Sequence, residues 1–182
     1  MRVIALSLFF SILIIFSGCE QDSKDKTTVS NKHTQEILSF ITIPNKEQSI
    51  TVKGKTATFE KKSKITLLYF FGSECFICKK NLPYLERLRE RYKEDITIYV
   101  FGINENSEDL ELSNALAYYS KTLNISFDKD NQKILDILRI HDEIKQSDMP
   151  ISLLYFNGTF YTTYESITPI EMIEADIKYL LK

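Results

Sequence analysis

Two cysteines, Cys75 and Cys78, are separated by two residues in the sequence Cys-Phe-Ile-Cys. They follow an apolar run at residues 65–71 and precede a segment whose apolar residues recur at helical intervals. The spacing places both thiols on nearly the same face at the start of a helix, close enough to form a disulfide. Unpaired N–H groups and the positive end of the helix dipole favour the thiolate of the first cysteine. Cys75 is therefore the expected nucleophile.

This arrangement predicts thiol-disulfide exchange. Cys75 would form a mixed disulfide with a partner, and Cys78, one turn deeper, would attack Cys75 and release that partner. A purely structural disulfide explains the spacing poorly, because so short a loop restricts the unfolded chain little. A zinc site would need His33 and His141 as further ligands, and these have no ligand spacing between them. We therefore expect no metal and no cofactor beyond the cysteine pair.

The third cysteine, Cys19, follows an apolar run at residues 3–16. This run is shorter than the ~20 residues that a membrane-spanning helix needs, so residues 1–18 are predicted to be a signal peptide. The small residues Ser17 and Gly18 before Cys19 resemble a bacterial lipobox, although Phe16 departs from the usual leucine. That resemblance implies an exported protein anchored to a membrane by a lipid on Cys19. An uncleaved signal anchor or an ordinary signal peptide is the alternative.

The rest of the sequence predicts one tether and one domain. Residues 19–35 contain almost no large apolar side chain and are predicted to be a flexible tether. Residues 36–182 are long enough to bury a single core. The formal net charge of −2 gives no indication of nucleic-acid binding.

Apolar patterns and turn residues predict an α/β domain with a central mixed sheet and helices on both faces. A small N-terminal β-hairpin is expected at residues 49–52 and 56–59. Further strands are expected at 65–71, 96–103, 124–127, 151–156 and 159–163, and helices at 76–92, 107–123, 130–140 and from Thr168. Pro83 should bend the first helix, residues 141–148 should form a loop, and Thr168 with Glu171 should form a capping box.

The sequence resembles the thioredoxin pattern in five features: a hydrophobic strand, a short turn, the CxxC pair, Pro83 and Pro150. The hairpin before the first core strand and the export signal resemble the TlpA/ResA/CcmG-like branch of periplasmic thiol-disulfide oxidoreductases. The resemblance covers about residues 40–182. It implies a thioredoxin-like fold.

The same resemblance implies roles for residues around the pair. Pro150 matches a cis-proline beside the CxxC, and Met149 would present its backbone to an extended substrate peptide. Phe76 is expected to be exposed, where it would line a partner groove.

Possible tuning residues are acidic. Glu74 stands where the family has tryptophan, and the chain contains no tryptophan. ResA-like members carry a glutamate that tunes the cysteine pair, and Glu105 and Glu108 are the two candidates for it here.

The leading functional hypothesis is a reductase that keeps exported cysteine-containing proteins, such as apocytochrome c, reduced. It would receive electrons from a membrane thiol-disulfide carrier and would face the periplasm. One alternative is an oxidant that introduces disulfides. Another is a non-enzymatic metal-binding lipoprotein of the same fold, although copper-handling relatives use CxxxC where this chain has CxxC.

Overall fold

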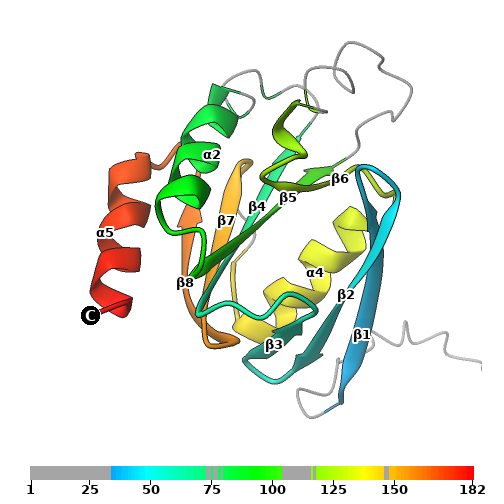
Figure 1. Cartoon of the computed structure of the whole chain (residues 1–182). Helices are drawn as coiled ribbons and strands as arrows, with labels where there is room; N and C mark the ends of the chain where they lie inside the picture. Colours follow the sequence, from blue (N-terminus) through cyan, green and yellow to red (C-terminus); the bar gives the residue numbers. More distant parts are fainter. Residues whose placement is uncertain are drawn as a thin grey trace, which may run out of the picture.

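The computed structural model describes residues 34–72, 75, 78, 80–103, 116, 118–145 and 148–182 (Figure 1). The strands are β1 (Glu36–Thr42), β2 (Lys46–Lys53), β3 (Thr56–Phe59), β4 (Ile65–Gly72), β5 (Ile96–Ile103), β6 (Asn124–Ser126), β7 (Ile151–Phe156) and β8 (Thr159–Glu165). The helices are α2 (Leu82–Arg91), α4 (Asn131–Asp142) and α5 (Ile170–Leu180). Most of the predicted helix at 107–123 lies outside the described residues.

Five strands form the central sheet, in the order β8-β7-β4-β5-β6. β4 is parallel to β5 and antiparallel to β7, so the sheet is mixed, as predicted. All eight residues of β5 are buried, as are the first seven of β4. Strands of this kind need a covering layer on each face.

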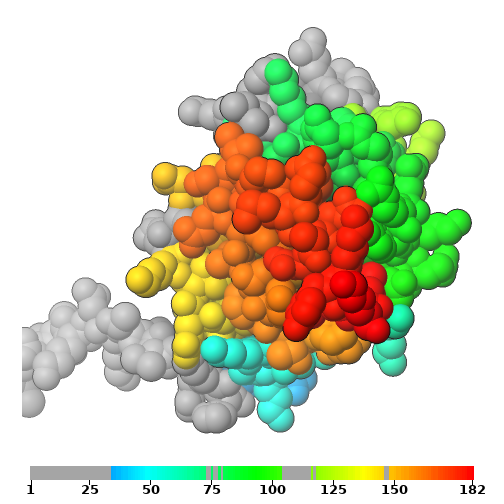
Figure 2. Space-filling model, turned by 90° about the vertical axis from the view of Figure 1, so that its left-hand side faces the viewer, coloured from blue at the N-terminus to red at the C-terminus, as the bar shows by residue number. Residues whose placement is uncertain are grey.

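Successive residues of the central strands contribute to two separate cores. In β4, Leu67 and Tyr69 pack against α2 and α5, whereas Leu68 and Phe70 pack against α4 and the β1–β3 strands. This alternation follows from the two-residue period of a strand. Figures 1 and 2 show α2 (green) and α5 (red) together on one side of the sheet, and Figure 1 shows α4 on the other.

The predicted hairpin is present as β2 and β3, and β1 pairs with β2 as a third strand, so the first three strands form an antiparallel meander. Alternating burial extends β2 back to Lys46, where it pairs with β1. Single residue pairs, Thr42–Ser126 and Thr56–Thr159, join the meander to both edges of the central sheet. These two contacts close the strands into a ring.

The prediction that Pro83 bends a continuous helix is wrong. The helix α2 begins at Leu82, so Pro83 lies in its first turn. Proline is tolerated there because the first N–H groups of a helix have no partner within the helix. Before α2, Asn81 N–H donates to the Cys78 carbonyl in a three-residue turn.

Two further local predictions need correction. Residues 141 and 142 belong to α4, so the predicted loop begins later, after Glu143 adopts a left-handed backbone. The expected capping box is also absent from the described N-terminus of α5. Pro169 is its N-cap residue, and the Thr168 hydroxyl donates to the Glu165 carbonyl.

Among the described helices, none is both long and apolar enough to cross a membrane.

Candidate active site

Cys75 and Cys78 form a disulfide between the end of β4 and the start of α2, with their Cα atoms 5.2 Å apart. Cys78 is fully buried, whereas Cys75 is half-buried. Cys75 N–H donates to the Gly72 carbonyl at 3.0 Å, and Cys78 N–H lies 3.2 Å from Cys75 Sγ. A partner can therefore reach Cys75 but not Cys78, which matches the roles expected for a nucleophile and a resolving thiol.

A tyrosine on β4 is hydrogen-bonded to the backbone of the cysteine pair. The hydroxyl of Tyr69 donates to the Cys78 carbonyl at 3.2 Å, and Asn81 Nδ2 donates to the Tyr69 oxygen at 3.4 Å. Burial raises the pKa of Tyr69 to about 12, so the hydroxyl keeps its proton and remains a donor. Neither Tyr69 nor Asn81 was predicted from the sequence to belong to the site. The available signal was a tyrosine hydroxyl within the apolar run of residues 67–71.

This network borders a small cavity of about 10 Å³. Tyr69, Asn81, Ser152 and Thr168 supply polar atoms to its wall. Ser152 is paired with Tyr69 in the β4–β7 register, and Leu85 of α2 and Ile173 of α5 also line the cavity, so it lies between the sheet and these two helices. The wall of the cavity is therefore partly polar.

The Met149–Pro150 peptide bond is cis, as the resemblance implies. Ile151 begins β7 and pairs with Phe70, close to the end of β4 that leads to Cys75. The register therefore brings Pro150 to the same edge of the sheet as the cysteine pair. Pro150 is buried and Met149 is half-buried. A second cis bond, Ile43–Pro44, lies in the β1–β2 turn and was not predicted.

Several predicted functional residues lie outside the described part of the chain. These are the lipid-anchor candidate Cys19, the partner-groove candidate Phe76 and the tuning candidates Glu74, Glu105 and Glu108. Their roles remain predictions.

The structure places His141 in α4, with its side chain fully buried. Its Nδ1 lies 3.2 Å from the Gly54 carbonyl oxygen and its Nε2 lies 3.1 Å from Glu36 Oε1. His141 thus joins α4 to the start of β1 and to the β2–β3 turn. Within the described residues, no three His, Cys, Asp or Glu side chains are grouped closely enough to hold a metal ion.

Solved structures of similar architecture include a thiol-disulfide oxidoreductase and a lipoprotein thioredoxin. The thioredoxin domain of a thiol-disulfide oxidoreductase from Bacteroides vulgatus is 19% identical, with a TM-score of 0.55 over 81% of this chain and 96% of that one. The exposed lipoprotein thioredoxin of Streptococcus pneumoniae is 17% identical, with a TM-score of 0.55 over 79% and 99%. StoA of Bacillus subtilis is 18% identical, with a TM-score of 0.54 over 79% and 97%.

No protein-family model matches the sequence, and no curated protein matches it either. The structural likeness nevertheless extends over nearly the whole of each of these three neighbours. The chain therefore has a thioredoxin-like fold, as the sequence predicted.

Proposed function

We propose that this protein is a thiol-disulfide oxidoreductase that acts through Cys75 and Cys78. The observation that carries the proposal is the asymmetric exposure of the disulfide, with Cys75 accessible and Cys78 fully buried. The cis peptide at Pro150, at the same edge of the sheet, adds support. The thiol-disulfide neighbours of the same fold support the reaction class.

The reductive reaction begins with both cysteines reduced. The Cys75 thiolate attacks one sulfur of a partner disulfide and forms a mixed disulfide, and the partner's other sulfur leaves as a thiolate that takes up a proton. The Cys78 thiol then loses its proton, and its sulfur attacks Cys75 Sγ. The second partner sulfur leaves and is protonated. The partner disulfide has gained two electrons, and Cys75 and Cys78 have become the disulfide.

We further propose that the reaction runs in this direction. The partners would be exported proteins with cysteine pairs, such as apocytochrome c, and a membrane thiol-disulfide carrier would reduce the pair again. The protein would be held by a lipid on Cys19 and would face the periplasm. The lipoprotein thioredoxin of Streptococcus pneumoniae offers a precedent for an anchored protein of this fold. No cofactor beyond the cysteine pair is required.

The direction can be tested by the reduction potential of the pair. A reductase requires a potential near that of thioredoxin, about −270 mV, whereas a disulfide-forming oxidant would lie near about −120 mV. Equilibration of the full chain with glutathione or dithiothreitol buffers, followed by thiol alkylation, gives this value. A potential near the oxidant value would overturn the reductase direction while leaving exchange itself intact.

The exchange reaction can be tested by trapping. In Cys78→Ser, the mixed disulfide formed by Cys75 cannot be resolved, so covalent adducts with partner proteins should accumulate in cells. Non-reducing gels and mass spectrometry would identify them. Cys75→Ser is the matched control, because of the redox pair it leaves only the buried Cys78 and should trap almost nothing. Equal trapping by both variants, or none by either, would contradict the proposed roles.

A further inference from the structure

A hollow of about 400 Å³ lies on the surface beside the C-terminal part of α2. Three separate segments line it: the loop between β3 and β4 at residue 61, residues 89, 90 and 93 at and just after the end of α2, and residues 120–124 leading into β6. Its volume lies within the range of small-molecule sites. The lining includes neither cysteine of the redox pair, so the hollow is separate from the candidate active site.

The charged lining of this hollow is mostly positive. Lys61, Arg89, Lys93 and Lys121 contribute four cations, whereas Glu90 is the one acidic residue of the lining. None of the four cations forms a salt bridge with a carboxylate of the described residues. The hollow therefore gathers positive charge that the described chain does not neutralise by direct pairing.

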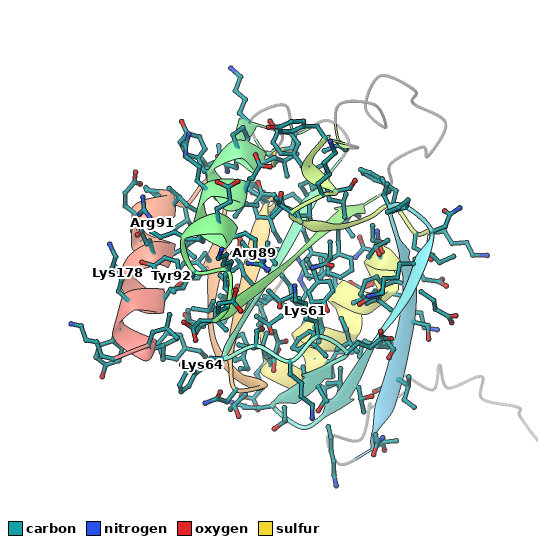
Figure 3. All side chains as sticks on the ribbon, viewed as in Figure 1. Lys61, Lys64, Arg89, Arg91, Tyr92 and Lys178 are labelled. Carbon is teal, nitrogen blue, oxygen red and sulfur yellow. A yellow bond between two sulfur atoms is a disulfide. The ribbon has the colours of Figure 1, made fainter. Side chains whose placement is uncertain are left out.

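Neighbouring basic residues behave differently. Arg91 lies 2.5 Å from Glu174 and Lys178 lies 3.0 Å from the same carboxylate, whereas Lys64 lies 2.9 Å from Asp95. In Figure 3, Arg91 lies beside α5, while Arg89 lies on the other side of α2, toward Lys61. Cations in the last turn of a helix stabilise its dipole, and both arginines share that effect. Only Arg89 also faces the hollow.

The charges in the hollow act on one another. The pKa of Lys61 is lowered, first by partial burial and then by repulsion from Arg89 and Lys46, against a weaker attraction from Glu94. Such repulsion opposes folding unless a counter-charge is present. A bound anion would therefore be stabilised by the cations and would in turn relieve their repulsion.

We propose that this hollow binds an anion carrying phosphate groups. Arginine presents a planar set of donors that fits phosphate oxygens, and lysines act as flexible point charges around them. The four cations come from three segments that line one concavity, which suits a compact, multiply charged group. The phosphate can belong to a soluble small molecule or to the headgroup of an anionic lipid, and the two sources share this chemistry.

The test uses the full chain in a non-ionic detergent, with inorganic pyrophosphate as the probe at constant ionic strength. Pyrophosphate should raise the melting temperature of the wild type in a saturable manner. In Lys61→Gln/Arg89→Gln, the apparent affinity should fall at least tenfold. Lys133→Gln removes one exposed charge from α4, outside the hollow, and should bind like the wild type. Lys121→Gln provides a second variant, with a smaller loss, if the double variant folds poorly.

The source of the phosphate is distinguished by two short-chain lipids used as soluble monomers. If dihexanoyl phosphatidylglycerol binds through Lys61 and Arg89 and dihexanoyl phosphatidylcholine does not, the hollow recognises an anionic headgroup. If only pyrophosphate binds through these residues, the ligand is a soluble phosphate. The proposal is overturned if neither probe stabilises the wild type, if the hollow variants bind as the wild type does, or if Lys133→Gln loses as much affinity.

Discussion

At the scale of single residues, the contact between Tyr69 and the Cys78 carbonyl fixes the backbone that carries the resolving cysteine. Replacing Tyr69 by Phe removes this hydrogen bond while keeping the ring that packs beside Phe71. We expect a loss of ~1 kcal/mol in the free energy of unfolding, the usual net contribution of one buried hydrogen bond. The release of mixed disulfides should also slow, because Cys78 is held less firmly.

Chemical denaturation and single-turnover exchange with a peptide disulfide would measure these two effects. Tyr84→Phe is the matched control, because Tyr84 is an exposed tyrosine on α2 and its ring lies beneath the Arg87 guanidinium. If Tyr69→Phe changes stability but leaves the release rate unchanged, Tyr69 has a structural role only.

At the scale of elements, Glu174 of α5 makes two polar contacts with the C-terminal end of α2 and one within α5. It accepts from Arg91 at 2.5 Å and from the Tyr92 hydroxyl at 3.0 Å, and it pairs with Lys178 at 3.0 Å. The hydrogen bond from Arg91 is the largest of the causes that lower the pKa of Glu174 to about 2. A carboxyl whose pKa is lower in the folded state stabilises the fold above its ordinary pKa and loses this contribution as the pH falls.

We therefore predict that Glu174→Gln is less stable than the wild type at pH 7 and that this difference disappears between about pH 4.5 and pH 2. Thermal melts across this range would measure it. Glu47→Gln changes an exposed glutamate on β2 and should leave the acid limb of the stability curve unchanged. A constant difference between Glu174→Gln and the wild type at every pH would contradict the linkage.

A second carboxyl, on α4, has the opposite pH dependence. Asp142 accepts a hydrogen bond from the Tyr155 hydroxyl of β7, and burial raises the pKa of Asp142 to about 6. The folded state therefore holds this proton more tightly than the unfolded state does, so stability falls as the pH rises from about 4 to about 6.

Replacing Asp142 by Asn should remove this decline, because the amide does not titrate in this range. We would measure the free energy of unfolding of the wild type and of Asp142→Asn by urea denaturation at several pH values. The wild type should lose stability relative to Asp142→Asn as the pH rises from about 4 to about 6, and the difference should be constant outside this range. Identical pH profiles would show that Asp142 is not the titrating group.

At the scale of the whole molecule, the ring of strands is closed beside the β7–β8 turn. Gly158 has a φ of +79°, and its carbonyl accepts from Ala57 N–H of β3 at 2.7 Å. A Cβ atom added at Gly158 would lie 2.9 Å from the Ala57 carbonyl oxygen. The turn therefore needs glycine both for its left-handed backbone and for the close approach of β3.

Gly158→Ala should lower the free energy of unfolding by ~2 kcal/mol or more, from the strain of a left-handed alanine and the displacement of β3. Gly72→Ala is the matched control, because its added Cβ would meet nothing within 4 Å. Denaturant titrations of both variants measure the difference. Equal stability of the two variants would show that the closure contributes little.

The sequence predicted the central sheet well, because β4, β5 and β7 are apolar runs and Asn157-Gly158 specifies a tight turn. It did not predict the closed ring, because each closing contact is one residue pair between distant strands. The apolar periodicity also placed Pro83 in the interior of a longer helix. The same spacing of apolar residues fits a helix that begins at Leu82, with Pro83 in its first turn.

The cysteine pair was visible because its chemistry lies in a short motif. Tyr69 and Asn81 were missed because their contacts depend on how β4 packs against the turn between Cys78 and α2. The cationic hollow was also invisible in the sequence, since Lys61, Arg89 and Lys121 come from three segments that only the fold assembles.

The bond between His141 and Glu36 has a mechanical consequence. The chain enters the folded domain at Glu36, whose register partner in β2 is Val52. A pull on the preceding segment would open the β1–β2 ladder one pair at a time, beginning with this pair. His141, fixed within α4, holds Glu36 at that point. If a lipid on Cys19 holds the protein on a membrane, a pull from the membrane would act first on the contact between His141 and Glu36. The force would therefore be borne by residues that do not form the redox pair.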